Sequence, residues 1–156
     1  TVMVKSYLRY KPAIDGCFGV VTSAGTGSSA FASIAFDPSG QLALAPALEA
    51  VAIWHIRNGT MVGKLHEESV VGVVTVLAIS PDQRQVAAGY SDGKIRLWDL
   101  SNNQCLVALS GHASAVSCLS YNSTGSLLVS GSNDTHIIVW DVVAERGLFR
   151  YDIGIR

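Results

Sequence analysis

The stretch that decides the fold is "SGSNDTHIIVWDV" at residues 130–142, where a turn aspartate lies six residues before Trp140. The pattern recurs in "AGYSDGKIRLWDL" at residues 88–100, where an aspartate again lies six residues before Trp98. The two tryptophans are 42 residues apart. A single copy could be an accident of composition, but recurrence at this spacing indicates a repeat protein.

A third and weaker copy lies upstream, in "ALAPALEAVAIWHI" at residues 43–56. Its Trp54 lies 44 residues before Trp98. His55 stands where the other copies have aspartate after the tryptophan, and Leu48 stands where they have the turn aspartate. The spacing is kept while the polar residues are lost, which extends the repeat to three units.

Each unit begins with two apolar stretches separated by a turn, which predicts a strand, a turn and a second strand. A third strand carries the tryptophan, and sequences such as "GTMVGKL" and "NQCLVAL" supply a fourth after another polar turn. The turn clusters between the first two strands are Asp37–Gly40, Ser80–Asp82 and Asn122–Gly125.

Four short strands every 42 to 44 residues, ending in Trp-Asp, resemble a blade of the WD-repeat family. The resemblance implies an all-β propeller whose blades each contain four antiparallel strands. Repeats are expected at about 31–65, 70–109 and 112–150. An amino-terminal arm and strand with a Gly/Ser loop at 1–30 would precede them, and 151–156 would be the truncated start of a next blade.

The third unit contains the polar residues that a buried tryptophan needs. An indole N–H on a central strand must find an acceptor, and Ser130, ten residues before Trp140, is placed to supply one. In WD repeats a histidine from the preceding loop, the hydroxyl, the turn aspartate and the tryptophan form a hydrogen-bonded chain. The resemblance therefore implies a structural network of His112, Ser130, Asp134 and Trp140, with His112 in the family's Gly-His loop dipeptide.

The other two units depart from this pattern. Asp92 and Trp98 are the network members expected in the middle unit, but Ala88 replaces the hydroxyl and the nearest histidine is His66. Its polar chain is therefore expected to be incomplete. The first unit keeps only Trp54, which should be held by packing alone.

Two enzyme interpretations can be weighed against these residues. A Ser-His-Asp triad needs an exposed nucleophile at a strained turn, whereas Ser130 lies inside the strand "LLVSGS". "GTGSSA" at 25–30 has the spacing of a dinucleotide-binding turn, but a strand-like stretch follows it instead of the required helix. We therefore expect no catalytic residues, no cofactor and no small-molecule substrate.

Composition agrees with an all-β core, since 49% of residues are hydrophobic and 15% are charged. The longest apolar run, at 70–79, is too short to span a bilayer, so no membrane association is expected. Cys17, Cys105 and Cys118 show neither an even number nor metal-ligand spacing, which disfavours a disulfide framework and a zinc site and favours a reducing compartment. The formal net charge of −1 provides no global attraction for nucleic acid.

The amino-terminal arm is the one basic and aromatic stretch. Lys5, Arg9 and Lys11 are interleaved with Tyr7 and Tyr10. Such a pattern can bind single-stranded RNA by charge and stacking, although three charges make a small footprint. The favoured interpretation is an arm that is solvated or docked on a partner.

Within the WD-repeat family, three stretches are similar to the tandem-propeller subunits of the UTP-B module of the small-subunit processome. The stretches are 3–20, 42–59 and 132–150. This resemblance implies ribosome biogenesis in the nucleolus, with small-subunit ribosomal RNA processing and the U-three small nucleolar ribonucleoprotein. The implied partners are other proteins of a large ribonucleoprotein assembly, with RNA contacted directly or through neighbours. The alternative is an adaptor in another complex, such as one in ubiquitin ligation or chromatin, because fold alone does not fix function.

An open propeller is expected, because roughly 4 to 8 blades are needed for closure. Closure would come from further chain, from self-association with another copy, or from a partner. Residues 16–22 ("GCFGVVT") are a candidate strand for completing a last blade. Thr1 and Val2 precede what resembles a natural initiator, Met3, which predicts an added remnant or an upstream extension.

Four residues near the turns of the middle unit are candidates for contact with a partner. The favoured interpretation is that they are ordinary exposed turn and strand residues. They are Arg84, Tyr90, Lys94 and Arg96.

Overall fold

The computed structural model describes residues 34–37 and 39–154, which form an all-β fold of three four-stranded sheets. The first sheet contains β1 (Ala35–Phe36), β2 (Leu42–Ala47), β3 (Ala50–His55) and β4 (Thr60–Leu65). The second contains β5 (Val74–Ile79), β6 (Gln85–Tyr90), β7 (Lys94–Asp99) and β8 (Gln104–Ser110). The third contains β9 (Val116–Tyr121), β10 (Leu127–Ser132), β11 (His136–Asp141) and β12 (Arg146–Asp152).

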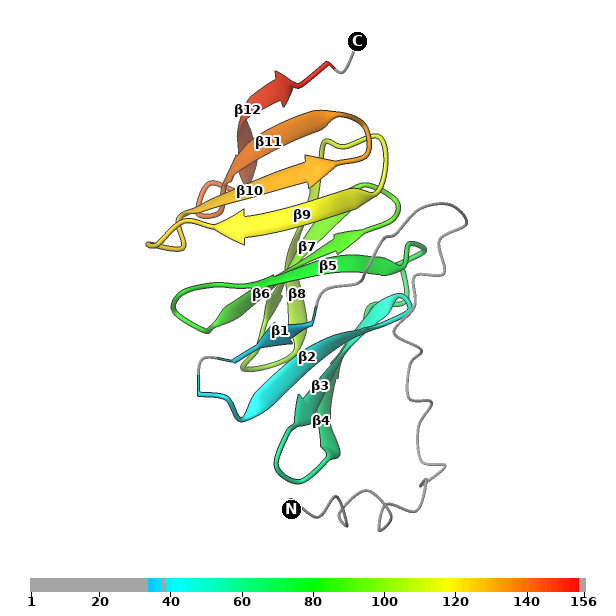
Figure 1. The fold of residues 1–156 in the computed structure, drawn as a ribbon, viewed down its shortest axis with the longest axis vertical. Coiled ribbons are helices and arrows are strands. Elements are labelled where there is room, and N and C mark those ends of the chain that lie inside the picture. The colour runs from blue at the N-terminus through cyan, green and yellow to red at the C-terminus, as the bar shows by residue number, and fades with distance from the viewer. Residues whose placement is uncertain (1–33, 38, 155–156) are drawn as a thin grey trace, which may run out of the picture.

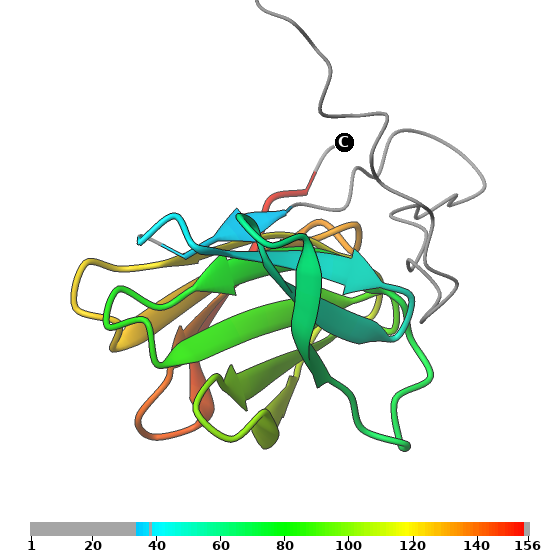
Figure 2. The same ribbon diagram turned by 90° about the horizontal axis from the view of Figure 1, so that it is seen from below.

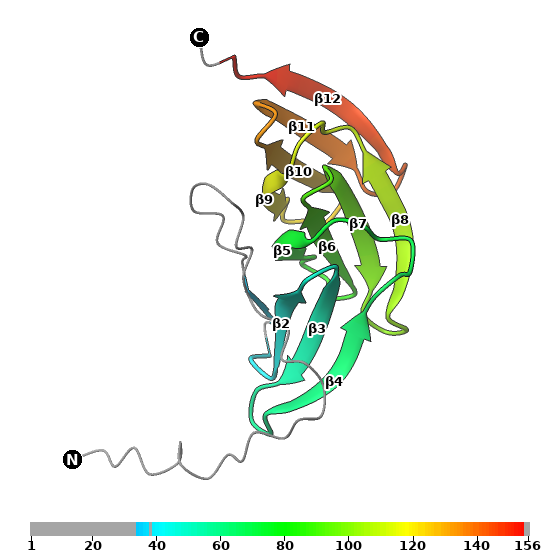
Figure 3. The same cartoon turned by 90° about the vertical axis from the view of Figure 1, so that its right-hand side faces the viewer.

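The strands of each sheet are antiparallel and follow one another in sequence order, as the repeats predict. The three sheets succeed one another along the long axis of the molecule (Figure 1), so they overlap when the molecule is seen from below along that axis (Figure 2). Figure 3 shows β4, β8 and β12 along one side of this arrangement, with β5 and β9 on the opposite side. The prediction of an all-β WD-type fold is therefore confirmed, and the described sheets form an open fan rather than a closed ring.

A shared irregularity relates the weak first unit to the other two. The ladder between the third and fourth strands shifts register immediately before Trp54, before Trp98 and before Trp140. Such a bulge bends the strand and increases its local twist. Because it recurs at the same position in each sheet, the three units have the same construction even where their polar residues differ.

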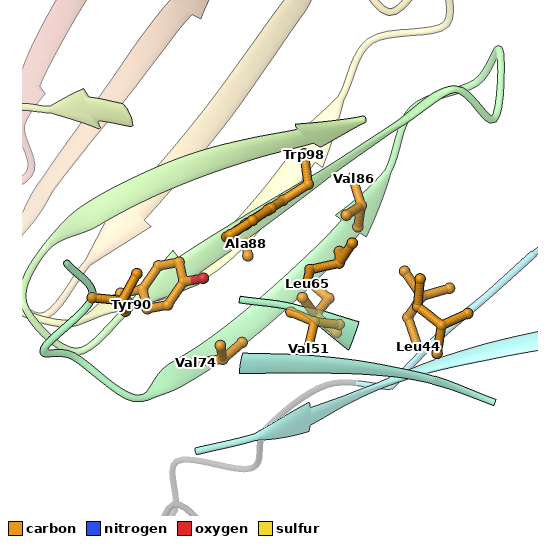
Figure 4. Close-up of a cluster of buried hydrophobic side chains, with 11 residues drawn as sticks. Leu44, Val51, Leu65, Val74, Val86, Ala88, Tyr90 and Trp98 are labelled. Atoms are coloured by element: carbon orange, nitrogen blue, oxygen red, sulfur yellow. The ribbon is translucent and has the colours of Figure 1, made fainter. Parts of the chain in front are cut away.

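The hydrophobic core lies between the sheets. The first core cluster joins the first and second sheets, and Figure 4 shows its side chains meeting between them. The second core cluster joins the second and third sheets. The first cluster contains Leu44, Val51, Ile53, Leu65, Val70, Val74, Leu77, Val86, Ala88, Tyr90 and Trp98. The second contains Val76, Ala87, Ile95, Leu97, Leu109, Val116, Leu128, Ile138 and Trp140.

One glycine lets the second and third sheets approach closely. A Cβ at Gly89 would lie 2.7 Å from Val76 Cγ1 and 2.8 Å from Val116 Cγ1. Real side chains avoid such distances, so any larger residue would force the two sheets apart. Two of the strands involved, β6 and β9, belong to different repeats, so this glycine acts on packing between units.

The third sheet leaves apolar side chains exposed on the side away from the second sheet. Val129 is 39% exposed, Phe149 59% and Tyr151 55%. In the second sheet the equivalent face is covered by the third. The exposed face therefore follows from the open arrangement of the described sheets.

Two boundary predictions meet the structure differently. The truncated start of a next blade at 151–156 is corrected, because Tyr151 pairs with Ile137 and Asp152 with His136 inside β12. The ladder continues there because the first residues of β11 need partners for their backbone groups. The predicted arm, strand and loop at 1–30 lie outside the described residues.

Candidate functional site

Four polar side chains of the third sheet lie within hydrogen-bonding distance of one another. Trp140 Nε1 donates to Ser130 Oγ at 2.8 Å. Ser130 Oγ lies 2.7 Å from His112 Nε2. The other ring nitrogen of His112, Nδ1, lies 3.1 Å from Asp134 Oδ2 and 3.2 Å from Oδ1. The structure thus brings together the four residues that the sequence grouped in this unit.

The direction of these hydrogen bonds follows from the groups at the two ends of the network, the Asp134 carboxylate and the Trp140 indole. The carboxylate of Asp134 only accepts, so His112 Nδ1 carries the proton that it donates there. His112 Nε2 is then left to accept the Ser130 hydroxyl proton, and Ser130 Oγ accepts the indole N–H. Each buried polar atom of this four-residue network has a hydrogen-bond partner. The network therefore avoids the desolvation cost of about 1–3 kcal/mol for each unmade hydrogen bond.

The same Ser-His-Asp order occurs in hydrolases, but here the nucleophile position is closed. Ser130 is 0% exposed, and its hydroxyl oxygen lies between the His112 ring and the Trp140 indole. A substrate carbonyl needs access to an exposed hydroxyl at a strained turn. This geometry therefore supports a structural network and not an acyl-transfer site.

Asp134 receives more hydrogen bonds than any neighbour in the network. Its Oδ2 accepts from the Ala113 amide at 2.8 Å, and its Oδ1 accepts from the His136 amide at 3.0 Å. Burial by itself would raise the pKa of Asp134. These two amides and the His112 ring outweigh that effect and hold the pKa well below its usual range. The carboxylate ties the loop before β9 to the turn between β10 and β11.

Gly111 is required by the position of Trp140. A Cβ at Gly111 would lie 2.8 Å from Trp140 Cη2 and 3.1 Å from Ile138 Cδ1. The backbone before His112 therefore lies against the indole at its Cη2 and Cζ2 atoms. This contact gives a physical reason for glycine before the histidine in this loop.

The second sheet does not join Asp92 and Trp98 into a comparable chain. Val70 lies four residues before β5, as His112 lies four residues before β9, and it is buried in the first core cluster. Among the described residues, Asp92 keeps the turn bond in which its Oδ1 accepts from the Lys94 amide at 3.0 Å. The structure therefore does not bring Asp92 and Trp98 together in a chain like that of the third sheet.

The second sheet lacks the network because two of its positions differ from those of the third sheet. Ala88 removes the hydroxyl that would accept from the Trp98 indole, and a valine at position 70 removes the imidazole. His66, the nearest histidine in the sequence, is exposed. Trp98 Nε1 is buried and makes no hydrogen bond of normal geometry among the described residues, and the Tyr90 hydroxyl is the polar group that interacts with it. It faces the first core cluster together with the Tyr90 hydroxyl (Figure 4).

Arg96 and Tyr90 differ from their favoured interpretation as exposed residues, because Arg96 is 3% exposed and Tyr90 0%. The Arg96 guanidinium lies 4.6 Å from the centre of the Tyr90 ring, a cation–π geometry. Its Nε lies 3.9 Å from Glu67 Oε2. Burial raises the pKa of Tyr90 to about 12, although the Arg96 charge acts in the opposite direction. Strand alternation was the available signal, since Arg96 lies two residues before Trp98 and shares its face.

The first sheet keeps the tryptophan in a different setting. Trp54 is only partly buried, and its neighbour His55 replaces aspartate at the strand end. His55 Nδ1 accepts from the Asn58 amide at 3.4 Å, so the imidazole occupies the place of a turn-capping carboxylate. Leu48 has a φ of 59° in the short turn between β2 and β3, where the other units have aspartate.

The aspartate of each Trp-Asp pair caps the next turn, a role that the sequence reasoning did not assign. Asp99 Oδ1 accepts from the Ser101 amide at 2.8 Å and from its hydroxyl at 2.7 Å. Asp141 Oδ1 accepts from the amides of Val143 and Ala144 at 3.0 and 2.9 Å. These Asx-type turns start the fourth strand of each sheet, and the signal was a carboxylate two residues before a polar turn.

Restoring the missing hydroxyl should stabilise the second sheet. We expect Ala88→Ser to raise the free energy of unfolding by about 1 kcal/mol, because Trp98 Nε1 would gain an acceptor. Ala88 pairs with Arg96 as Ser130 pairs with Ile138, so the hydroxyl would be equivalently placed. Urea unfolding followed by circular dichroism measures the change. Ala87→Ser, on the opposite face of β6, is the control and should destabilise, and a similar loss at position 88 would contradict the assignment.

Other classes of site have little support in the described part of the chain. Within residues 34–37 and 39–154, no group of three His, Cys, Asp or Glu side chains is arranged to hold a metal ion. No helix in that part is long and apolar enough to cross a membrane. Cys105 and Cys118 are free thiols, and burial raises the pKa of Cys105. The arm residues Lys5, Tyr7, Arg9, Tyr10 and Lys11, together with Cys17, lie outside the described residues.

Comparison with known families gives two matches. A family model described as WD domain, G-beta repeat matches residues 103–141. A model described as Vps8 beta-propeller matches residues 57–114. Together these matches extend from the end of the first sheet into the third.

Similar proteins are much longer than this chain. U3 small nucleolar RNA-associated protein 12 of Saccharomyces cerevisiae is 37% identical over 83% of the chain, which spans 15% of that protein. WD repeat-containing protein 3 homolog of Dictyostelium discoideum is 38% identical over 73% of the chain, which spans 11% of that protein. Transcription factor unc-37 of Caenorhabditis elegans is 28% identical over 76% of the chain, which spans 19% of it.

The sheets and their matches lead to one assignment. Three consecutive four-stranded antiparallel sheets share a bulge before each tryptophan, and the third has a closed His, Ser, Asp and Trp network. The repeat model covers the fourth strand of the second sheet and most of the third sheet. The chain belongs to the WD-repeat family of β-propeller proteins.

Proposed function

We propose that the chain is a non-catalytic WD-repeat scaffold for protein assembly in ribosome biogenesis, acting in small-subunit ribosomal RNA processing in the nucleolus. The observation that carries this proposal is the similarity to U3 small nucleolar RNA-associated protein 12, which extends over 83% of the chain. The name of that protein associates it with a small nucleolar RNA. The partners proposed for this chain are therefore proteins of a large ribonucleoprotein assembly.

The geometry supports a scaffold rather than an enzyme. The polar side chains of the third sheet are satisfied by one another and buried, so they stabilise the sheet without reaching a substrate. WD-repeat propellers present their loops and blade surfaces to other proteins. The exposed apolar face of the third sheet is a further surface on which another blade, another copy or a partner would pack.

The arm residues are proposed as the segment through which RNA or a neighbouring protein is contacted. Lys5, Arg9 and Lys11 provide positive charge, and Tyr7 and Tyr10 provide aromatic surfaces. Three charges give a modest electrostatic contribution that salt would weaken. This arm is therefore an addition to protein contacts and not the main source of affinity.

Recovery of U3 small nucleolar RNA with the tagged chain tests the proposal. We expect the full 156-residue chain, produced in yeast, to enrich that RNA and to sediment with pre-ribosomal particles on a sucrose gradient. The matching segment of a transcription-factor relative is the control and should not enrich it. Equal recovery with both chains would overturn the proposal. Replacing Lys5, Arg9 and Lys11 by alanine tests the arm, which should lower RNA recovery while leaving sedimentation unchanged.

A second candidate is an adaptor in another nuclear complex, such as one on chromatin. The similarity to Transcription factor unc-37 favours it, because that match covers 76% of the chain. The same fractionation separates the two functions. Recovery of the tagged chain in the chromatin fraction, without U3 small nucleolar RNA, would support the adaptor.

A further inference from the structure

A groove of about 760 Å³ lies between the first and second sheets. Its volume falls in the range of roughly 300–1,000 Å³ that is typical of ligand sites. Its lining mixes apolar and polar side chains, and we call the polar ones the rim: Asp37, Gln83, Arg84, Gln85, Asp99, Ser101 and Asn103. The apolar side chains are Leu42, Leu44, Ile53, Val62, Ile79 and Leu100.

The groove exists because two positions of the repeat contain unusually small residues. Gly63 pairs with Ile53 in the first sheet, where Val107 pairs with Leu97 in the second. Val107 packs against the core between the second and third sheets, so the equivalent space there is filled by a side chain. Gly63 contributes no side chain to that space, and the Asn103 amide and the Ile53 side chain reach into part of it.

The opposite wall shows the same difference. Ile79 ends β5 at the position that Tyr121 occupies at the end of β9. Tyr121 packs against the second core cluster and Ile79 against the first, but the smaller Ile79 also lines the groove. Gly63 and Ile79 are therefore both smaller than their counterparts, Val107 and Tyr121, at the next junction.

The rim places an amide side chain where the fold favours glycine. Gln83 has a φ of 62°, in the left-handed region. The equivalent turn positions of the first and third sheets are Gly40 and Gly125, with φ of 68° and 74°. A non-glycine residue there costs about 1 kcal/mol or more, and such strain is concentrated at functional sites. Gln83 therefore keeps a hydrogen-bonding side chain at the groove at the expense of stability.

A second rim residue, Asn103, also has a left-handed backbone, with a φ of 59°. It faces Gly63, since a Cβ on that glycine would lie 3.3 Å from Asn103 Nδ2. Primary amides both donate and accept, which suits the N–H and C=O groups of an extended peptide backbone. The groove thus combines an apolar slot with two amides on its rim.

The charges on the rim favour a basic ligand. Asp37 and Asp99 carry two negative charges, and Arg84 carries the single positive one. Hydrogen bonds from the hydroxyl and amide of Ser101 lower the pKa of Asp99 and keep it ionised. The net charge of the rim is therefore negative.

We propose that this groove binds an extended peptide segment of a partner protein, which inserts one large aliphatic side chain and carries flanking lysine or arginine. The inference rests on the proposed scaffold function and names the kind of partner segment that one of its surfaces accepts. The aliphatic side chain packs on the apolar lining of the groove, which includes Leu42, Ile79 and Leu100. The flanking cations face Asp37 and Asp99, and the peptide backbone bonds to the rim amides.

The test is a titration of the purified chain with a defined peptide, acetyl-Ala-Lys-Leu-Lys-Ala-amide, followed by NMR chemical shifts. We expect shifts at the groove and saturable binding. Gly63→Val puts a branched side chain against the Asn103 amide and into the groove, and should weaken binding at least about tenfold, a loss of 1.4 kcal/mol. Ala108→Val adds two carbons, one fewer than Gly63→Val, at an exposed position of β8 and should leave the affinity unchanged.

Changing the charge of the groove or of the peptide provides an independent test, again measured as binding affinity. Arg84→Glu should strengthen binding of the basic peptide by about threefold, in the range of exposed ion pairs. The peptide with glutamate in place of both lysines should bind at least about tenfold more weakly. Unchanged affinity in Gly63→Val, equal affinity for the acidic peptide, or absence of binding to the basic one would each overturn the proposal. The titration uses the chain alone, so its failure leaves the RNA recovery test intact.

Discussion

Trp140→Phe is expected to lower the free energy of unfolding by about 3 kcal/mol, while Trp98→Phe is expected to lower it by only about 1 kcal/mol. Both tryptophans are buried, at 4% and 1% exposure, and lie at equivalent positions before the fourth strand of their sheets. The loss of indole volume is therefore similar at the two sites. The difference lies in the hydrogen bond.

Trp140 Nε1 donates to Ser130, so its removal breaks a satisfied chain. Trp98 Nε1 is buried and makes no hydrogen bond of normal geometry among the described residues, so its removal also relieves a desolvation cost. Urea unfolding of the two variants, followed by far-ultraviolet circular dichroism, measures the difference. Equal losses, or a larger loss at Trp98, would show that packing alone sets the cost and that the network contributes nothing measurable.

Asp134→Ala is expected to destabilise the chain by about 3 kcal/mol, because it removes the acceptor of three hydrogen bonds in a nearly buried site. His112 Nδ1 and the amides of Ala113 and His136 would lose their partner. For a chain of this size the melting temperature should fall by roughly 8 °C. Differential scanning calorimetry at neutral pH measures it. Asp92→Ala is the matched control and should cost less, since Asp92 caps only its own turn.

The Asp134 carboxylate also makes the free energy of unfolding depend on pH in the acidic range. The pKa of Asp134 in the folded chain lies below its ordinary value of 3.8. The unfolded chain therefore binds the proton more readily, and the contribution of Asp134 is complete above pH 3.8. That contribution is lost as the pH falls from 3.8 through the lower folded value. The difference in unfolding free energy between the parent and Asp134→Asn should narrow over this window, and a constant difference would contradict the assignment.

The sequence alone determined the repeat and the residues of the third network. Trp54, Trp98 and Trp140 lie at spacings that only a repeated supersecondary unit explains, and the turn clusters divide each unit into strands. Within a hairpin, pairing register follows from turn length and the two-residue period of a strand. Ser130 and Trp140 could therefore be placed on one face before any coordinates were considered.

Only the tertiary structure decided which residues meet between units. His66 is the histidine nearest to the middle blade in sequence, yet Val70 occupies the place of His112, because the loop before β5 is positioned by packing of the first core cluster. Arg96 is buried for the same reason, since its strand face is covered by the preceding sheet. Likewise, the groove beside Gly63 depends on the distance between two sheets. Local pattern fixes each blade, whereas contacts between blades depend on how neighbouring sheets fill the space between them.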